Sequence, residues 1–310
     1  MIQAALDVGA TFPPFETLPL PQARAFMKRA YAAKKVEVAV EKVRHLLIPG
    51  PGGDLPMRVY VPPAGQGPRP QLLPIVVFFH GSGFVLLDLD THDDFCRRMC
   101  VGASCVVVSV DYRLAPEHPY PAGPDDCLAA THWVVANAGE LGGDASRTVL
   151  AGDSAGGCFA AVTAIRIRDE GGPALRGQLL VYPVTDYPSV KNESFKQFGS
   201  GFGLTTSGMQ WFWDQYIPDR SVVHQPQVSP LRAKSFRGLP SACVLVAEYD
   251  ILRDEGEAYA AALRAAGVAV VSRRCARMNH GFLKYAGLID EADAAVLQAC
   301  GWLKQVFAAQ

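Results

Sequence analysis

Residues 148–157 read TVLAGDSAGG, an apolar run that ends in a cluster of glycine, serine and alanine. A buried strand that turns sharply into a helix needs small residues around the turn, and Gly152 and Gly156 stand at those positions. Such a turn exposes the hydroxyl of Ser154 and leaves the amide of Ala155 free at the start of the helix. The pattern also fits a tight turn with an incidental serine, so other stretches must decide between the two interpretations.

The composition predicts one compact α/β domain with a cap or insertion, because 310 residues with 49% hydrophobic content can bury a large core. The formal net charge of −1 gives no reason to expect nucleic acid or an anionic membrane surface as a partner. No secretion signal is visible, and no run of about 18 apolar residues could span a bilayer. The eight cysteines form no C-x-x-C pair or metal site and are expected to be buried thiols in a reducing cytoplasm.

Apolar runs alternate with helical patterns along most of the chain, which predicts a mostly parallel sheet flanked by helices. The first two runs are joined by a Pro/Gly turn and predict a hairpin, whereas the later runs are continuous, as in strands covered on both faces. Strands are expected at residues 43–48, 55–61, 75–79, 105–110, 148–151, 179–182, 243–247 and 268–272. Helices are expected at residues 91–101, 125–138, 155–169, 254–266 and 291–307.

Two segments depart from this alternation and predict a helical cap. Residues 1–42 precede the first strand and contain a helical stretch that is free to lie over the sheet. An insertion at about 186–225 is dense in aromatic residues and glycine, which favours a cover over a pocket. The alternative for the insertion is an ordinary helix with an aromatic stripe that faces the core. The main domain is expected to span residues 43–310.

The base that would activate Ser154 must be a histidine that follows it in the chain, if the order is serine, acid, histidine. His224 and His280 are the two histidines after Ser154. His280 comes just past the last expected strand, where a loop can bring it to the serine, whereas His224 lies in the insertion with no strand before it. His280 is therefore the predicted base.

The acid that orients this histidine should stand at the end of the preceding strand. Asp250 occupies that place after the run VLVAEY. Glu248 and Asp254 remain alternatives, although Asp254 and Glu255 fit better in the first turn of the next helix, where the helix dipole favours a negative charge.

The sequence FFHGSGF follows a buried strand and is similar to the H-G-G-G loop that supplies oxyanion donors in esterases. The amides of Ser82 and Gly83 are expected to join that of Ala155, with Gly81 shaping the turn. His80 is expected to be structural rather than catalytic.

With these motifs, the chain resembles the hormone-sensitive-lipase-like carboxylesterases of the α/β-hydrolase fold, often called bacterial family IV. The resemblance runs from about residue 40 to the C-terminus and rests on HGSGF at 80–84, DYRLAPEHPYPA at 111–122, GDSAGG at 152–157, DILRDEG at 250–256 and HGF at 280–282. It implies an eight-stranded sheet, a cap made of the N-terminal helices and the segment after the sixth strand, and a triad that includes Asp250 and His280. Similar proteins often form homodimers through their last strand, which is one expectation here.

Ser82 is a departure from the family, whose loop has glycine at this position. If the position needs a positive φ, serine carries a steric penalty that glycine avoids, although its amide is still present. Plant hormone receptors that share the fold lack the catalytic histidine, so the presence of His280 argues against a pure receptor.

The sequence therefore predicts a serine hydrolase, without metal or cofactor, that cleaves short- to medium-chain acyl esters through an acyl-enzyme. Amide or lactone hydrolysis, as in an amidase or arylformamidase, and a weakly catalytic small-molecule receptor are the alternatives. The side chains expected to line the substrate pocket are Phe84, Tyr182, Leu204, Trp211, Trp213, Ile251 and Phe282.

Overall fold

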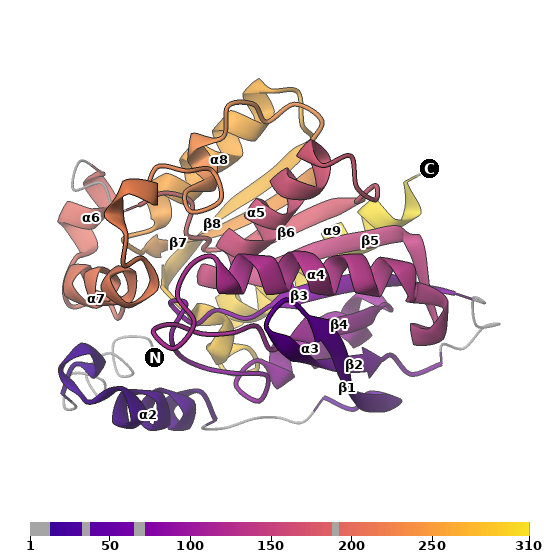
Figure 1. Ribbon diagram of the computed structural model, residues 1–310, viewed down its shortest axis with the longest axis horizontal. Helices are drawn as coiled ribbons and strands as arrows, with labels where there is room; N and C mark the ends of the chain where they lie inside the picture. Colours follow the sequence, from indigo (N-terminus) through magenta and orange to yellow (C-terminus); the bar gives the residue numbers. More distant parts are fainter. Residues whose placement is uncertain (1–12, 33–37, 65–71, 188–191, 310) are drawn as a thin grey trace.

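The computed structural model describes residues 13–32, 38–64, 72–187 and 192–309 and contains one eight-stranded sheet (Figure 1). The strands are β1 (Lys42–Gly50), β2 (Gly53–Val61), β3 (Leu73–Phe79), β4 (Val106–Val110), β5 (Gly143–Asp153), β6 (Gly177–Val181), β7 (Ser241–Tyr249) and β8 (Val270–Asn279). Their spatial order is β1-β2-β4-β3-β5-β6-β7-β8. β1 and β2 form the predicted hairpin, β2 runs antiparallel to β4, and all other neighbours are parallel. The predicted fold class is therefore confirmed.

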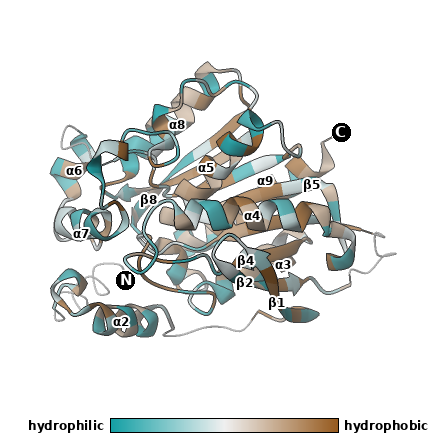
Figure 2. Cartoon of the chain, viewed as in Figure 1, coloured by the Kyte–Doolittle hydropathy of each residue, from teal (hydrophilic) through white to brown (hydrophobic). Residues whose placement is uncertain are grey.

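The α-helices cover both faces of this sheet. They are α2 (Leu20–Ala32), α3 (Asp93–Ala103), α4 (Ala122–Ala136), α5 (Ala155–Asp169), α6 (Glu193–Phe198), α7 (Thr206–Tyr216), α8 (Arg253–Ala265) and α9 (Asp290–Ala308). Helices α4, α5 and α8 lie against one face, and α3 and α9 against the other (Figure 1). Figure 2 shows hydrophobic and hydrophilic colours on the same covering helices, as expected for helices with one packed face.

Alternate residues of the central strands enter two different cores. In β3, Ile75, Val77 and Phe79 pack with α4 and α5, whereas Val76 and Phe78 pack with α3 and α9. Successive side chains of a strand point to opposite faces, so a strand buried on both sides must be apolar throughout. This requirement explains why the central strands were predictable as continuous apolar runs.

The prediction that the last strand is covered on both faces is wrong. β8 is the edge strand of the sheet, extends to residue 279 and has mostly exposed or half-exposed residues. Val271 is 41% exposed. An edge strand has a neighbour on one side only, so its sequence tolerates the polar residues that hid its second half from sequence analysis.

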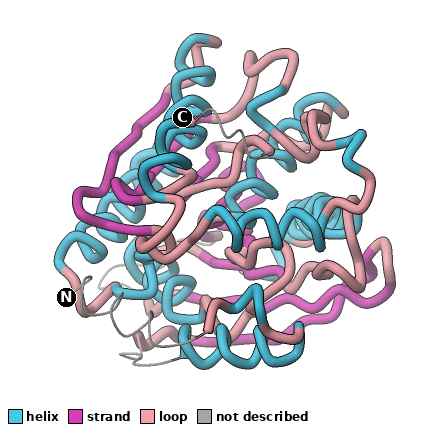
Figure 3. Tube along the Cα trace, turned by 90° about the vertical axis from the view of Figure 1, so that its left-hand side faces the viewer, coloured by secondary structure: helices cyan, strands magenta, loops and turns pink. Residues whose placement is uncertain are grey.

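The helices of the two predicted cap segments gather at one end of the sheet, as Figures 1 and 3 show. Helices α6 and α7 lie between β6 and β7 in the sequence, and α2 precedes β1. The ring of Phe15, which lies just before α2, stacks on that of Phe212 in α7 with centroids 5.0 Å apart, so the N-terminal segment and the insertion touch. Parts of both predicted cap segments, at residues 1–12, 33–37 and 188–191, lie outside the described residues. In the described ranges, no helix is long and apolar enough to cross a membrane.

Candidate active site

The turn between β5 and α5 carries Ser154 in a backbone conformation that residues with a side chain rarely adopt, with φ 54° and ψ −121°. A Cβ on Gly152 would lie 2.2 Å from the carbonyl oxygen of Gly156. A Cβ on Gly156 would lie 2.0 Å from the carbonyl oxygen of Phe79. Both positions need glycine because neighbouring backbone fills the space of a side chain.

The serine, histidine and aspartate selected from the sequence lie within hydrogen-bonding distance of one another. His280 Nε2 is 2.9 Å from Ser154 Oγ, and His280 Nδ1 is 2.7 Å from Asp250 Oδ2. Asp250 is 2% exposed and also accepts a hydrogen bond of 2.9 Å from the amide of Leu252. A proton on Nδ1, bonded to the carboxylate, leaves Nε2 able to accept the proton of the hydroxyl.

The alternative acids and base have other partners. Glu248 Oε2 accepts a hydrogen bond from the amide of Arg277, and Asp254 Oδ2 accepts one from the amide of Ser194. His224 is exposed in the loop that follows α7. The geometry therefore assembles Ser154, His280 and Asp250 and leaves these alternatives elsewhere.

Three backbone amides remain available near the serine. Gly81 donates its amide to Asp153 Oδ1 at 2.7 Å, so this amide serves to hold the loop. Within the described part of the chain, the amides of Ser82, Gly83 and Ala155 donate no hydrogen bond. Unpartnered amides beside a nucleophile are the donors that a tetrahedral oxyanion requires.

Ser82 does not carry the steric penalty considered from the sequence, since the positive φ of the loop falls on Gly83 and Phe84. The hydroxyl of Ser82 instead braces the loop: Phe84 donates its amide to Ser82 Oγ at 2.9 Å, and Ser82 Oγ is 2.7 Å from Tyr112 Oη. Tyr112 in turn donates to the carbonyl oxygen of His80 at 2.6 Å. Serine at this position therefore adds a side-chain bridge that glycine cannot form.

His80 is fully buried, and its ring stacks on that of Tyr112 with centroids 4.4 Å apart. Burial, followed by the charge of His92, lowers the pKa of His80 to about 3. A neutral ring packed in this way fits the structural role expected from the sequence.

The side chains predicted to line the substrate pocket differ in exposure. Phe84, Tyr182, Trp213, Ile251 and Phe282 are buried, whereas Leu204 and Trp211 are half-buried. The ring of Tyr182 contacts that of His280, with centroids 4.7 Å apart. Trp213 is 0% exposed and packs against Phe84 and Tyr187, so it belongs to the core rather than to an open surface.

Two aromatic residues, one from α7 and one from α2, reach the site without a signal in the sequence. A Cβ on Gly83 would lie 2.4 Å from the ring of Phe212. This ring of α7 therefore packs on the loop at residues 80–84, which we call the oxyanion loop. A Cβ on Gly281 would lie 2.9 Å from Tyr31 Oη, which places this hydroxyl of α2 beside the histidine loop. Both contacts depend on how these helices pack on the sheet, which neither periodicity nor motif spacing reveals.

Known proteins share this chain's sequence and fold. A family model described as alpha/beta hydrolase fold matches residues 76–284. The carboxylic ester hydrolase LipN of Mycobacterium tuberculosis (strain ATCC 25618 / H37Rv) is 47% identical over 247 residues, which cover 78% of this chain and 64% of LipN. The carboxylesterase NlhH of the same strain is 42% identical over 293 residues, covering 88% of this chain and 90% of NlhH. A thermostable esterase from Pseudomonas putida ECU1011 has a solved structure with a TM-score of 0.94, 41% identity and coverage of 100% of this chain and 97% of the esterase.

Proposed function

The chain belongs to the hormone-sensitive-lipase-like family of α/β-hydrolases and is a carboxylic-ester hydrolase, and we propose that it works through an acyl-enzyme formed on Ser154. The observation that carries this proposal is the hydrogen-bonded series Ser154–His280–Asp250. The parallel order of the sheet supports it, because loops at the carboxyl ends of neighbouring strands bring distant residues together.

In the proposed mechanism, Ser154 Oγ attacks the acyl carbon while His280 Nε2 takes its proton. Asp250 holds the ring and balances the positive charge of the imidazolium. The amides of Ser82, Gly83 and Ala155 donate to the oxyanion of the tetrahedral intermediate. His280 then returns the proton to the leaving alcohol, and water repeats the two steps to release the acid.

We propose that residues 1–42 and 186–225 cap the site and that the preferred acyl groups are short to medium in length. The packing of the Phe212 ring on Gly83 supports this preference, because an aromatic side chain already fills space beside the oxyanion loop. A long acyl chain would have to displace this ring.

The test is hydrolysis of p-nitrophenyl esters from acetate to palmitate by the wild type and by Ser154→Ala. We expect turnover on the shorter esters, a loss of about 10⁵-fold or more in kcat for the variant, and an intact-mass shift of the wild type equal to one acyl group. Ser221→Ala is the control, since Ser221 is an exposed serine. Activity that survives Ser154→Ala would remove Ser154 from the mechanism, and binding without turnover would favour a receptor.

We further propose a reducing cytoplasmic location and a homodimer through β8. The eight buried, free cysteines support the former, and the edge position of β8 supports the latter. Cell fractionation and light scattering of the purified protein test the two proposals separately.

A further inference from the structure

The oxyanion loop is hydrogen-bonded to the carboxylate of Asp153, the residue directly before Ser154. Asp153 is 3% exposed, and its Oδ1 accepts the Gly81 amide at 2.7 Å. A Cβ on Gly81 would lie 2.3 Å from Asp153 Oδ2, so the carboxylate packs closely against the loop backbone. Any rotation of this carboxylate would therefore move Gly81 and the amides of Ser82 and Gly83 that follow it.

Asp153 has a second partner, His92, which stands just before α3. His92 Nε2 lies 3.3 Å from Asp153 Oδ1, and both side chains are almost fully buried, 6% and 4% exposed. The other ring nitrogen, His92 Nδ1, is 3.0 Å from Thr91 Oγ1. Thr91 Oγ1 donates to the carbonyl oxygen of Asp88 at 2.6 Å and accepts from the amide of Asp88 at 3.1 Å.

These contacts give each ring nitrogen of His92 an oxygen partner. The hydroxyl hydrogen of Thr91 is used by the carbonyl of Asp88, so the contact with His92 Nδ1 requires an N–H on the ring. The carboxylate of Asp153 lies 3.3 Å from His92 Nε2 and can accept a hydrogen bond from an N–H at that nitrogen.

The electrostatics of Asp153 agree with this arrangement. Burial would raise the pKa of Asp153, but the charge of His92, its hydrogen bond and the Gly81 amide hold this pKa below its usual range. The ring of His80 lies 5.6 Å from that of His92 and is neutral, and the ring of Tyr31 of α2 lies 5.8 Å from that of His92. The pair is therefore buried among aromatic rings.

We propose that His92 is a positioning residue of the reaction: its ring orients Asp153, which holds Gly81 and thereby positions the amides that donate to the oxyanion. This inference rests on the proposed function, because it assigns His92 to the same oxyanion hole. Without His92, the buried carboxylate would lose one of its polar partners and would turn or take up a proton. The loop amides would then shift away from the position where the negative charge develops.

The test compares His92→Leu with His92→Gln on p-nitrophenyl acetate. We expect His92→Leu to lower kcat by about 10- to 100-fold with KM within about threefold, because misaligned donors act mainly on the transition state. His92→Gln retains an amide donor toward Asp153 and should recover about fivefold or more of that loss. His132→Leu is the matched control, an exposed histidine of α4 that should leave kcat and KM unchanged.

A second readout separates positioning from general damage to the fold. An aryl trifluoromethyl ketone, which forms an oxyanion adduct with the serine, should bind His92→Leu about 10- to 100-fold more weakly than the wild type, whereas benzyl alcohol, a product analogue, should bind equally. Unchanged kcat in folded His92→Leu, a loss confined to KM, or equal ketone affinity would each overturn the proposal.

If His92→Leu does not fold, Thr91→Val decides the question, because it removes the acceptor of His92 Nδ1 with little change in shape. A drop of about threefold or more in kcat is expected for Thr91→Val, and wild-type kinetics would overturn the proposal. Wild-type esterase activity that vanishes in Ser154→Ala shows that the proposed function stands whatever His92 does. If Ser154→Ala stays active, the proposed function fails and the inference fails with it.

Discussion

Asp111 shows how a single side chain can make the stability of this fold depend on pH. It follows β4 and is half-buried near Asp88 and Arg58. Burial, together with the charge of Asp88, raises the pKa of Asp111 from 3.8 to about 6, although Arg58 partly opposes the shift. Between these two values the folded chain keeps a proton that the unfolded chain has lost, so this group's contribution to stability falls as the pH rises through about 6.

Asp111→Asn should therefore be more stable than the wild type at pH 8, by about 1 kcal/mol because part of the carboxyl faces solvent, and the difference should narrow toward pH 4. Urea denaturation of both proteins at pH 4.5 and pH 8 measures this change in the free energy of unfolding. An equal difference at both pH values would point to hydrogen bonding rather than titration.

At the level of single residues, the sequence was sufficient where chain order limits the choice. His280 is one of two histidines after Ser154, and Asp250 stands at a strand end, so their placement beside Ser154 could be predicted without a structure. The partners of Asp153 were not, because Gly81 is 72 residues away in the chain and His92 reaches the carboxylate from a different loop. Such contacts arise from tertiary packing, and periodicity carries no information about them.

At the level of elements, strands buried on both faces were predictable and partly exposed segments were less so. β3 has only apolar residues and was found within two residues of its true start. The first half of β5 reads GDASR, a polar composition typical of a loop, yet Gly143 pairs with Leu73 across a register shift. Local composition predicts a strand only where burial selects the side chains.

The β5–α5 turn leads to a prediction about two glycines in helices. Gly156→Ala should lower the free energy of unfolding by more than about 3 kcal/mol, since its Cβ would lie 2.0 Å from backbone that cannot move without displacing β3. Gly301→Ala in α9 meets no atom within 4 Å and should raise stability by about 0.5–1 kcal/mol through helix propensity. Denaturant unfolding of both variants measures the contrast, and similar effects at the two sites would contradict the close approach at the turn.

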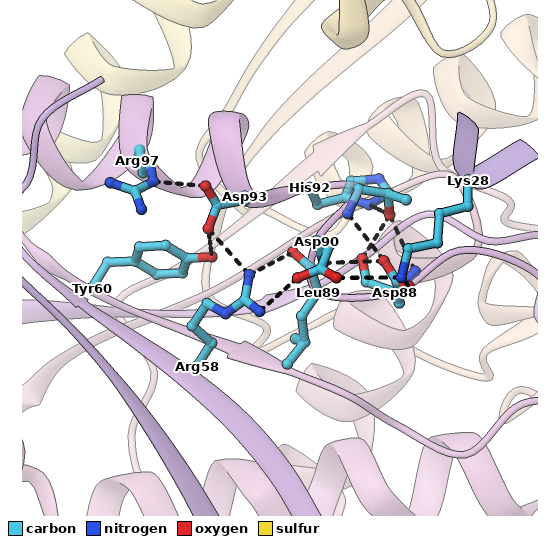
Figure 4. Close-up of polar contacts among 10 residues, drawn as sticks. Lys28, Arg58, Tyr60, Asp88, Leu89, Asp90, His92, Asp93 and Arg97 are labelled. Atoms are coloured by element: carbon cyan, nitrogen blue, oxygen red, sulfur yellow. Dashed lines mark hydrogen bonds and ion pairs between the residues drawn. The ribbon is translucent and has the colours of Figure 1, made fainter. Parts of the chain in front are cut away.

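For the molecule as a whole, α2 is attached to the sheet domain by a few polar contacts with the loops that follow the strands. In one set, Lys28 Nζ lies 2.6 Å from Asp88 and 3.3 Å from Asp90, and Asp90 is also paired with Arg58 of β2 (Figure 4). These groups are partly exposed, and such ion pairs contribute at most about 1 kcal/mol each. The loop that binds Lys28 through Asp88 also contains His92, which contacts Asp153. One short segment therefore contacts both α2 and the residue that holds the oxyanion loop.

Arg24 makes more hydrogen bonds to the rest of the molecule than Lys28 does. It is therefore the residue with which to test whether α2 can unfold independently of the sheet. Its guanidinium donates to the carbonyl oxygens of Val85 at 2.9 Å and Ala115 at 3.1 Å and pairs with Glu117 through two bonds of 2.7 Å. Arg24→Met leaves two carbonyls without this donor, at a cost of about 1–3 kcal/mol, and should speed hydrogen exchange in α2 by about 5- to 100-fold while the central strands keep their protection. Arg29→Met, an exposed change on the same helix, is the control. Faster exchange throughout the sheet would mean that α2 unfolds together with the whole molecule, and unchanged exchange in α2 would mean that its aromatic contacts alone hold it in place.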